Sequence, residues 1–272
     1  MTSLLGPVGR AWEARTSHAP PDLVRLVLAD VDGVITRGEG QSVDLDVLER
    51  LAEVNAAARE NDSTPAVTLC TGRQAPYVEL LAQMVGAFLP CIFEHGCGLF
   101  APESYRYAFE PALGPDYAAR LASLRAALER PVLRAGRAFV QPGKEASMSL
   151  YPLGTTTVTE LCDLVRPVVP AGWDVSPNVH GVEVRPLGID KGTGAEWLAS
   201  SVGLPLHQMA GVGDSDPDLA FLTRVGLSAA PANATPAVKA GVSWVVTYEY
   251  GRGLLEILTR LEARNRARLT DT

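Results

Sequence analysis

The chain has 272 residues, of which 47% are hydrophobic and 20% are charged. These values are typical of a globular protein with a full hydrophobic core, and they exclude a disordered chain. Acidic residues outnumber basic ones by 31 to 24, and the formal net charge of -7 argues against non-specific nucleic-acid binding. No apolar stretch is long enough for a bilayer, and the four cysteines lack metal-binding spacing. We therefore expect a cytoplasmic protein, either monomeric or homodimeric, with no membrane or nucleic-acid partner.

Strands and helices alternate in the first part of the chain. After an N-terminal extension over residues 1–22, an almost continuous apolar run at 23–29 predicts a buried strand. A helix is predicted over 44–59, a second strand over 66–70 and a second helix over 77–85. Because short links join them, the crossovers should be right-handed and the sheet parallel and doubly wound.

A middle segment, residues 101–186, has a different pattern. Its predicted elements are a helix over 114–130, a hairpin over 137–151, a helix over 157–165 and a strand pair over 173–185. The first pattern then returns, with elements expected over 191–201, 207–212, 217–223, 226–229, 244–246 and from about residue 253. We interpret the middle segment as an α+β cap domain inserted into an α/β core that consists of residues 23–100 and 187–272.

Paired carboxylates follow the first predicted strand. Ligands of open α/β sheets bind beyond the carboxyl ends of the strands. Asp30 and Asp32 lie there, two residues apart in an extended segment, so their side chains can point the same way. One carboxylate could attack phosphorus while the other transfers a proton to the leaving group. On its own, however, this Asp-Val-Asp-Gly segment is equally consistent with a simple turn.

Three further motifs could complete a phosphate site. Thr71 and Gly72 offer a hydroxyl and backbone N–H groups at a helix start. Lys191 begins a helix, and Asp214 and Asp218 are one helical turn apart. Each has an ordinary alternative, namely a capping threonine, a solvated lysine or a Pro-containing cap. Together, carboxylates that converge on a phosphate dianion repel each other unless a divalent cation and a lysine are present, and all-oxygen ligands favour Mg²⁺.

The combined motifs closely resemble those of the haloacid dehalogenase superfamily of phosphohydrolases. The matching segments are DVDGVIT (30–36), TGR (71–73), EHGCGLF (94–100), GIDKG (188–192), GDSDPDLAFL (213–222) and APANATPAVKAG (230–241). The place of the insertion resembles the class II cap of the Cof-type subclass IIB. EHGCGLF and the chain length are similar to those of mannosyl-3-phosphoglycerate and archaeal-type phosphoglycolate phosphatases and, more distantly, sucrose-phosphate phosphatases.

The resemblance implies a Rossmann-like core and a magnesium-dependent phosphatase that works through an aspartyl-phosphate. Asp30 would be the nucleophile and Asp32 the acid and base. Phosphate contacts are expected from Thr71, Gly72, Arg73 and Lys191. The Mg²⁺ site would consist of Asp30, the backbone carbonyl of Asp32, Asp214 and, in a supporting role, Asp218. Val34 replaces a usual threonine, and His95 and Pro217 replace usual asparagines, but none of these changes removes a catalytic group.

The cap is expected to choose the substrate. Alternation along its strands predicts that one set of side chains packs on the cap helices, namely Ala146, Met148, Leu150, Val182 and Val184. The opposite, polar face would then close over Asp30 with Glu145, Ser147, Ser149, Glu183 and Arg185, and with His180 and Lys144 at the strand turns. Such groups suit a small phosphorylated metabolite, namely a sugar phosphate or a phospho-acid, and the resemblance implies mannosyl-3-phosphoglycerate as one example. The alternative is a polar face that is merely solvated.

Two other functions are compatible with parts of the pattern. A phosphomutase or phosphotransferase would use the same scaffold and return the phosphoryl group to a sugar, and product analysis would separate it from a hydrolase. A phospho-accepting receiver module also uses Asp, Thr and Lys on a doubly wound sheet. It presents them in a different order, however, and has no inserted cap.

Overall fold

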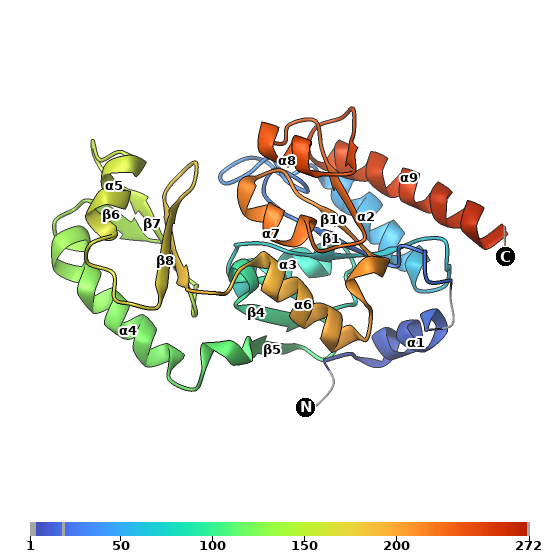
Figure 1. Cartoon of the computed structure of the whole chain (residues 1–272), viewed down its shortest axis with the longest axis horizontal. Coiled ribbons are helices and arrows are strands. Elements are labelled where there is room, and N and C mark those ends of the chain that lie inside the picture. The colour runs from blue at the N-terminus through green and yellow to red at the C-terminus, as the bar shows by residue number, and fades with distance from the viewer. Residues whose placement is uncertain (1–3, 18–19, 271–272) are drawn as a thin grey trace.

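The computed structural model of the protein describes residues 4–17 and 20–270. Its centre is a five-stranded parallel sheet with the order β12-β11-β10-β1-β2. The strands are β1 (Leu26–Ala29), β2 (Ala66–Leu69), β10 (Met209–Val212), β11 (Leu227–Ala230) and β12 (Trp244–Val245). The neighbours β1 and β10 come from opposite sides of the insertion (Figure 1). The predicted doubly wound α/β core is therefore confirmed.

Helices cover both faces of this sheet. On β1, Val27 and Ala29 face one hydrophobic cluster, whereas Leu26 and Leu28 face another, as expected for a strand buried on both sides. The first cluster includes α2 (Leu45–Ala58), α3 (Ala75–Met84) and α9 (Tyr250–Thr270). The second includes α1 (Pro7–Thr16), α6 (Lys191–Val202), α7 (Leu219–Leu222) and α8 (Pro236–Gly241). No helix in the described ranges is long and apolar enough to span a membrane.

The N-terminal segment is part of the packed core. We expected only an extension before the domain, but α1 buries Trp12 edge-on against Phe88, with ring centroids 6.3 Å apart. Glu103 accepts hydrogen bonds from the first turn of α1, at Val8 N and Gly9 N. The helix has few apolar residues, so its packing depends on long-range contacts that periodicity alone does not indicate.

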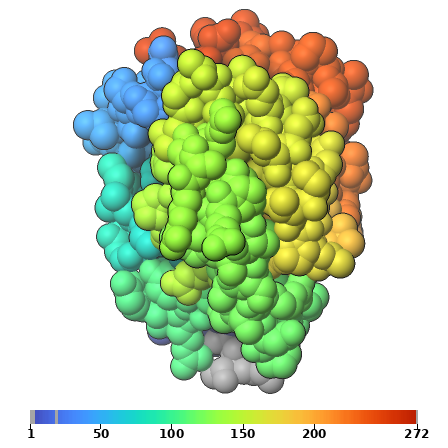
Figure 2. All heavy atoms as spheres, turned by 90° about the vertical axis from the view of Figure 1, so that its left-hand side faces the viewer, coloured from blue at the N-terminus to red at the C-terminus, as the bar shows by residue number. Residues whose placement is uncertain are grey.

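The insertion folds as a cap on one end of the core (Figures 1 and 2). Its antiparallel sheet has the order β6-β7-β9-β8, with β6 (Ala138–Val140), β7 (Met148–Pro152), β8 (Trp173–Pro177) and β9 (Val182–Pro186). The helices α4 (Tyr117–Leu128) and α5 (Val158–Val165) pack on it, with a π-helical turn at Glu129–Leu133. Met148, Leu150, Val182 and Val184 lie in this cluster, as predicted. Ala146 does not: it precedes β7 and packs with Cys97, Leu113 and Ile189.

A short antiparallel sheet that we did not predict links the core to the cap. It contains β3 (Cys91–Phe93), β4 (Gly98–Ala101) and β5 (Arg106–Phe109). The chain therefore reaches the cap sheet only after residue 109, and the limits at residues 101 and 186 stay a prediction. Other boundaries move by a few residues: the segment expected as a helix over 217–223 is a 3-10 turn at Asp216–Asp218 followed by α7.

A buried asparagine side chain ties α2 to the edge of the main sheet. Asn55 of α2 donates from Nδ2 to the Val85 carbonyl and accepts from the Val67 N–H of β2, both at 2.8 Å. It is completely buried. Because β2 ends the sheet, this amide satisfies a backbone group that no further strand can reach.

We predict that Asn55→Leu lowers the free energy of unfolding by roughly 2–4 kcal/mol, because it leaves one buried donor and one buried acceptor unsatisfied. Urea denaturation measures the loss. Gln83→Leu, a similar change at an exposed site of α3, serves as the control and should change stability by less than about 0.5 kcal/mol. Equal effects of the two substitutions would contradict the prediction.

Candidate active site

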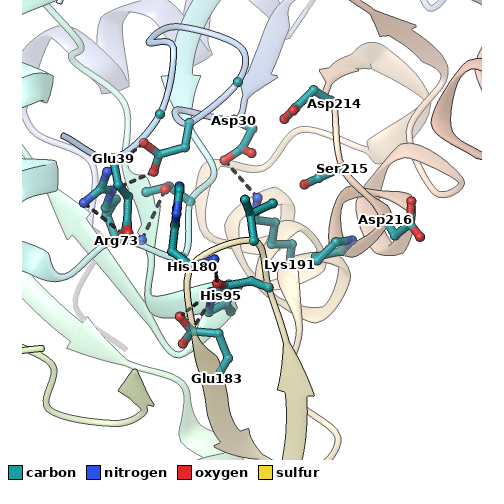
Figure 3. A pocket seen from close by; sticks show the side chains of 18 of the residues that line it. Asp30, Glu39, Arg73, His95, His180, Glu183, Lys191, Asp214, Ser215 and Asp216 are labelled. Carbon is teal, nitrogen blue, oxygen red and sulfur yellow. Dashed lines mark hydrogen bonds and ion pairs between the residues drawn. The ribbon is translucent and has the colours of Figure 1, made fainter. Parts of the chain in front are cut away.

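The predicted reactive residues meet at one end of the core sheet. Asp30 follows β1, Thr71 follows β2, Asp214 follows β10, and Lys191 begins α6. All four line a cavity of about 550 Å³ between the core and the cap (Figure 3). This volume lies in the range of small-molecule sites.

Lys191 is held between two carboxylates. Its Nζ lies 2.8 Å from Oδ1 of Asp30 and 2.5 Å from Oδ1 of Asp218. All three side chains are buried. Burial alone would lower the pKa of Lys191, but Asp218 and Asp30 outweigh it and raise this pKa, so the ammonium stays charged.

The carboxylates carry more charge than this lysine can balance. Asp30, Asp214 and Asp218 each offer an oxygen within 4.8 Å of the others. Burial, followed by repulsion from Asp218, raises the pKa of Asp30 and raises the pKa of Asp214 to about 7. Oδ1 of Asp214 is buried and accepts no hydrogen bond from any described residue. An all-oxygen donor set with a free buried oxygen fits a divalent cation.

Asp218 differs from the other two carboxylates because its oxygens already have partners. Oδ1 accepts from Lys191, and Oδ2 accepts from the Asp214 N–H and from the N–H and hydroxyl of Ser215. These bonds fix the loop that carries Asp214. Asp218 thus contacts both the lysine and the loop, and its supporting role at a metal site stays a prediction.

Gly33 lets the loop after β1 approach Asp214 closely. Its φ is +90°, and a Cβ there would lie 2.1 Å from Oδ2 of Asp214. Only glycine combines this backbone conformation with so close an approach. The Asn233 side chain donates to the Gly33 carbonyl at 2.8 Å and holds the loop from the other side.

Arg73 binds two carboxylates in this structure. Its Nε and Nη2 lie 2.6 and 2.7 Å from Oδ2 and Oδ1 of Asp32, and its Nη1 lies 3.2 Å from Oε1 of Glu39. The guanidinium also lies over the Tyr77 ring, 4.8 Å from the centroid. This bidentate pair with Asp32 has a geometry that guanidinium and carboxylate groups favour. Arg73 lines the cavity, and its contact with phosphate stays a prediction.

The segment Glu94–Gly96 connects the active site to the cap. Glu94 and His95 both have left-handed backbones, with φ of 47° and 57°. The buried Glu94 carboxylate accepts hydrogen bonds of 2.8–3.0 Å from the N–H groups of residues 145–147 and from the Ser147 hydroxyl. The His95 ring lies against Gly72, where a Cβ would be 2.3 Å from it, and faces Glu183 at 3.6 Å.

The predicted cap face is polar, but several of its groups are engaged by other protein side chains. Of its residues, only Glu183 and His180 line the cavity, together with Lys144. Glu183 pairs with Lys144 at 2.8 Å and accepts from the Ser149 hydroxyl. The structure does not bring Glu145, Ser147, Ser149 or Arg185 to the cavity: Ser147 binds Glu94, and Arg185 pairs with Asp174. The alternation along the strands predicted correctly which side chains face away from the cap core, but it did not predict their pairing with other side chains.

Several residues that line the cavity were not identified from the sequence. They are Arg37, Glu39, Gln141, Asn178, Asn233, Thr235 and Tyr250. Arg37 and Glu39 follow the aspartate motif closely, which is the one signal that could have indicated them. Of the three departures, Val34 is buried in the core, His95 contacts the cap residue Glu183, and Pro217 lines the cavity in a 3-10 turn.

Comparisons with known proteins identify the family of this chain. A model of the haloacid dehalogenase-like hydrolases matches residues 171–258. The phosphoglycolate phosphatase of Pyrobaculum aerophilum is 31% identical over 234 residues, which are 85% of this chain and 93% of the relative. The chain belongs to the haloacid dehalogenase-like hydrolases. The phosphoglycolate phosphatase of Halorubrum lacusprofundi is 29% identical, and the match covers 89% of this chain and 99% of that relative.

Solved structures show the same fold. A protein of Thermoplasma acidophilum superposes with a TM-score of 0.69 at 20% identity, over 88% of this chain and 99% of its own. The Synechocystis sucrose-phosphatase, solved with sucrose and phosphate, superposes with a TM-score of 0.62 at 17% identity. The match covers 88% of this chain and 98% of the sucrose-phosphatase chain. The predicted haloacid dehalogenase fold with its cap and the predicted phosphatase class are confirmed.

The largely buried imidazole of His95, whose side chain is 13% exposed, should make the stability of this phosphatase depend on pH. Burial lowers the pKa of His95 to about 4, although Glu183 partly offsets the effect. The unfolded chain, with a histidine pKa of about 6.5, then binds more protons between these values, so stability falls as the pH drops from about 6.5 to 4. The loss should reach about 3 kcal/mol at about 1.36 kcal/mol per pKa unit. Urea denaturation between pH values of about 6.5 and 4 should show that His95→Asn lacks this pH-dependent loss of stability. The same pH dependence in the wild type and in His95→Asn would contradict its assignment to His95.

Proposed function

We propose that this phosphatase is a magnesium-dependent phosphomonoester hydrolase that works through an aspartyl-phosphate on Asp30, with phosphoglycolate as the favoured substrate. The observation that carries the proposal is the buried cluster of Asp30, Lys191 and Asp218, which lies beside Asp214 at the carboxyl ends of β1 and β10. A phosphate group that enters the same cavity meets a carboxylate, an ammonium and the hydroxyl of Thr71.

Two chemical steps follow from this arrangement. In the first, an Asp30 oxygen attacks phosphorus, the bond from phosphorus to the leaving oxygen breaks, and Asp32 gives that oxygen a proton. In the second, Asp32 takes a proton from water, and the water oxygen attacks the aspartyl-phosphate. The acyl phosphate bond breaks, which releases inorganic phosphate and restores Asp30. Lys191 keeps one oxygen of Asp30 fixed in both steps, because their atoms lie 2.8 Å apart.

The residues that would hold Mg²⁺ are Asp30, Asp214 and the backbone carbonyl of Asp32, with Asp218 orienting the site. When bound, the cation would stabilise the charge on the transferring phosphoryl group. The raised pKa values of Asp30 and Asp214 support this proposal, since they reflect an excess of buried negative charge.

A phospho-acid substrate is favoured by the one cavity cation without a carboxylate partner in the described part of the chain. Lys144, Arg73 and Lys191 each pair with an acidic side chain. Arg37 instead lies over the Tyr250 ring, 5.6 Å from the centroid, and lines the same cavity. A guanidinium of this kind binds a carboxylate well. The relatives named phosphoglycolate phosphatases support the same substrate.

Metal removal tests the cation site. Chelation should abolish activity, Mg²⁺ should restore it, and Ca²⁺ should inhibit because its coordination is larger and looser. Mg²⁺ at 100 times its dissociation constant should also stabilise the folded protein by about 2.7 kcal/mol. Asp214→Asn should lose most of this stabilisation, whereas Asp163→Asn on the exposed cap surface should keep it. Full activity in excess chelator would contradict the proposal.

The substrate proposal is tested with Arg37→Met. Its KM for phosphoglycolate should rise by at least roughly tenfold, because a charge-assisted pair with a carboxylate contributes about 1.5–3 kcal/mol. Hydrolysis of nitrophenyl phosphate, which has no carboxylate, should change by less than about twofold. Arg130→Met at an exposed cap position is the matched control. Equal release of glycolate and inorganic phosphate would exclude a phosphotransferase outcome, and no hydrolysis of phosphoglycolate would refute this substrate.

A further inference from the structure

A continuous row of side chains joins the cap to Asp32. Tyr151 of the cap strand β7 donates its hydroxyl to Glu39, at 2.6 and 2.7 Å from the two carboxylate oxygens. Glu39 pairs with Arg73 at 3.2 Å, and Arg73 binds Asp32 through two nitrogens. Figure 3 shows Glu39 and Arg73 together on one side of the cavity. The cap thus contacts the proposed acid and base through two intermediates.

Hydrogen bonds from the Gly38 N–H to Thr36 Oγ1 and from the Gln41 N–H to the Gly38 carbonyl close the turn that carries Glu39, but its glycines are not packed. Gly38 and Gly40 flank it with φ values of +118° and +72°, and a Cβ at either position would meet no atom within 4 Å. The loop is therefore not held by packing at these positions. The place of the Glu39 carboxylate depends on its partners, Tyr151 on the cap and Arg73 on the core.

Arg73 links the position of the Glu39 carboxylate to that of Asp32, because its planar guanidinium contacts both side chains. Two nitrogens bind Asp32, the third binds Glu39, and one face lies over Tyr77. In a bidentate pair the carboxylate lies nearly in the plane of the guanidinium. A rotation of Arg73 therefore rotates the Asp32 carboxylate with it.

Tyr151 is firmly placed at the cap end of the row. Its ring stacks on Phe139 of β6, with centroids 5.3 Å apart and an interplanar angle of 18°. Burial and the Glu39 carboxylate raise the pKa of Tyr151, so the phenol stays protonated and remains a donor. Because Tyr151 belongs to β7 of the cap sheet, a displacement of the cap also displaces its hydroxyl.

We propose that Tyr151 and Glu39 are positioning residues that couple the contact between cap and core to the orientation of the Asp32 carboxylate for proton transfer. The inference rests on the acid and base role of Asp32 given above. As the bond from phosphorus to the leaving oxygen breaks, the Asp32 proton passes to that oxygen. If Asp32 is misdirected, this transfer slows, and the reaction slows most for leaving groups that need the proton.

The test uses Tyr151→Phe, Glu39→Gln and the double variant on ring-substituted phenyl phosphates with Mg²⁺. These esters have nearly the same size and differ in the basicity of the leaving group. Both single variants should lose about tenfold in kcat on the most basic leaving group and less than about twofold on nitrophenyl phosphate. Because the two residues act in series, the double variant should be no slower than Glu39→Gln.

Matched controls separate this effect from general damage to the fold. Tyr117→Phe matches Tyr151→Phe at another site of the cap, and Glu49→Gln matches Glu39→Gln on the exposed side of α2. Both controls should leave the dependence of kcat on leaving-group basicity unchanged. Thermal unfolding should show that all variants are folded at the assay temperature. Equal fractional losses on every ester, or losses that multiply in the double variant, would overturn the coupling.

Asp32→Asn distinguishes the failure of this inference from the failure of the proposed function. Asp32→Asn should steepen the dependence on leaving-group basicity more than either positioning variant does. If its losses are equal on all esters, the role of Asp32 is wrong and the coupling is wrong with it. If Asp32→Asn gives the steep dependence while Tyr151→Phe and Glu39→Gln match the wild type, only the coupling is wrong.

Discussion

The proposed catalytic end of this protein depends on the buried ammonium of Lys191. Its pairs with Asp30 and Asp218 join a residue after the first strand to residues encoded after the cap. Without it, two buried carboxylates would lack their cationic partner, at a cost of about 3–5 kcal/mol for a broken buried pair. The parallel pairing of β1 with β10 brings these residues together, because the carboxyl ends of both strands lie at the same edge.

The cap is positioned by the same edge of the core. Glu94 and His95 adopt left-handed backbones, which usually cost about 1–3 kcal/mol each, and the hydrogen bonds from residues 145–147 to Glu94 offset this cost. Glu39 provides a second attachment, on a loop flanked by glycines. The cap therefore contacts the core beside the cavity that Asp30 and Lys191 line, and we propose that the position of the cap and the geometry of this site are linked.

The sequence predicted the core and the convergence of Asp30, Thr71 and Asp214 on one cavity, because both rest on local patterns. Apolar runs that end in Asp30, Thr71 and Asp214 identify buried parallel strands and their carboxyl ends. The sequence did not predict the partners of these residues. Glu39, Arg73 and Tyr151 meet through long-range packing, and α1 lacks a clear apolar periodicity. On the cap, alternation separated Met148 from Ser149 correctly but could not show that Ser149 binds Glu183 instead of facing the cavity.

The most direct test of the account is to look for a phosphoryl group on Asp30. Asp32→Asn, mixed with nitrophenyl phosphate and Mg²⁺, should still form the aspartyl-phosphate, since this leaving group needs little protonation, but should hydrolyse it slowly. Acid quench and peptide mass spectrometry should then find one added phosphoryl group on the peptide that contains Asp30, and none when Asp30 is also changed to Asn. Turnover without any phosphorylated intermediate, or a label on another residue, would contradict the account.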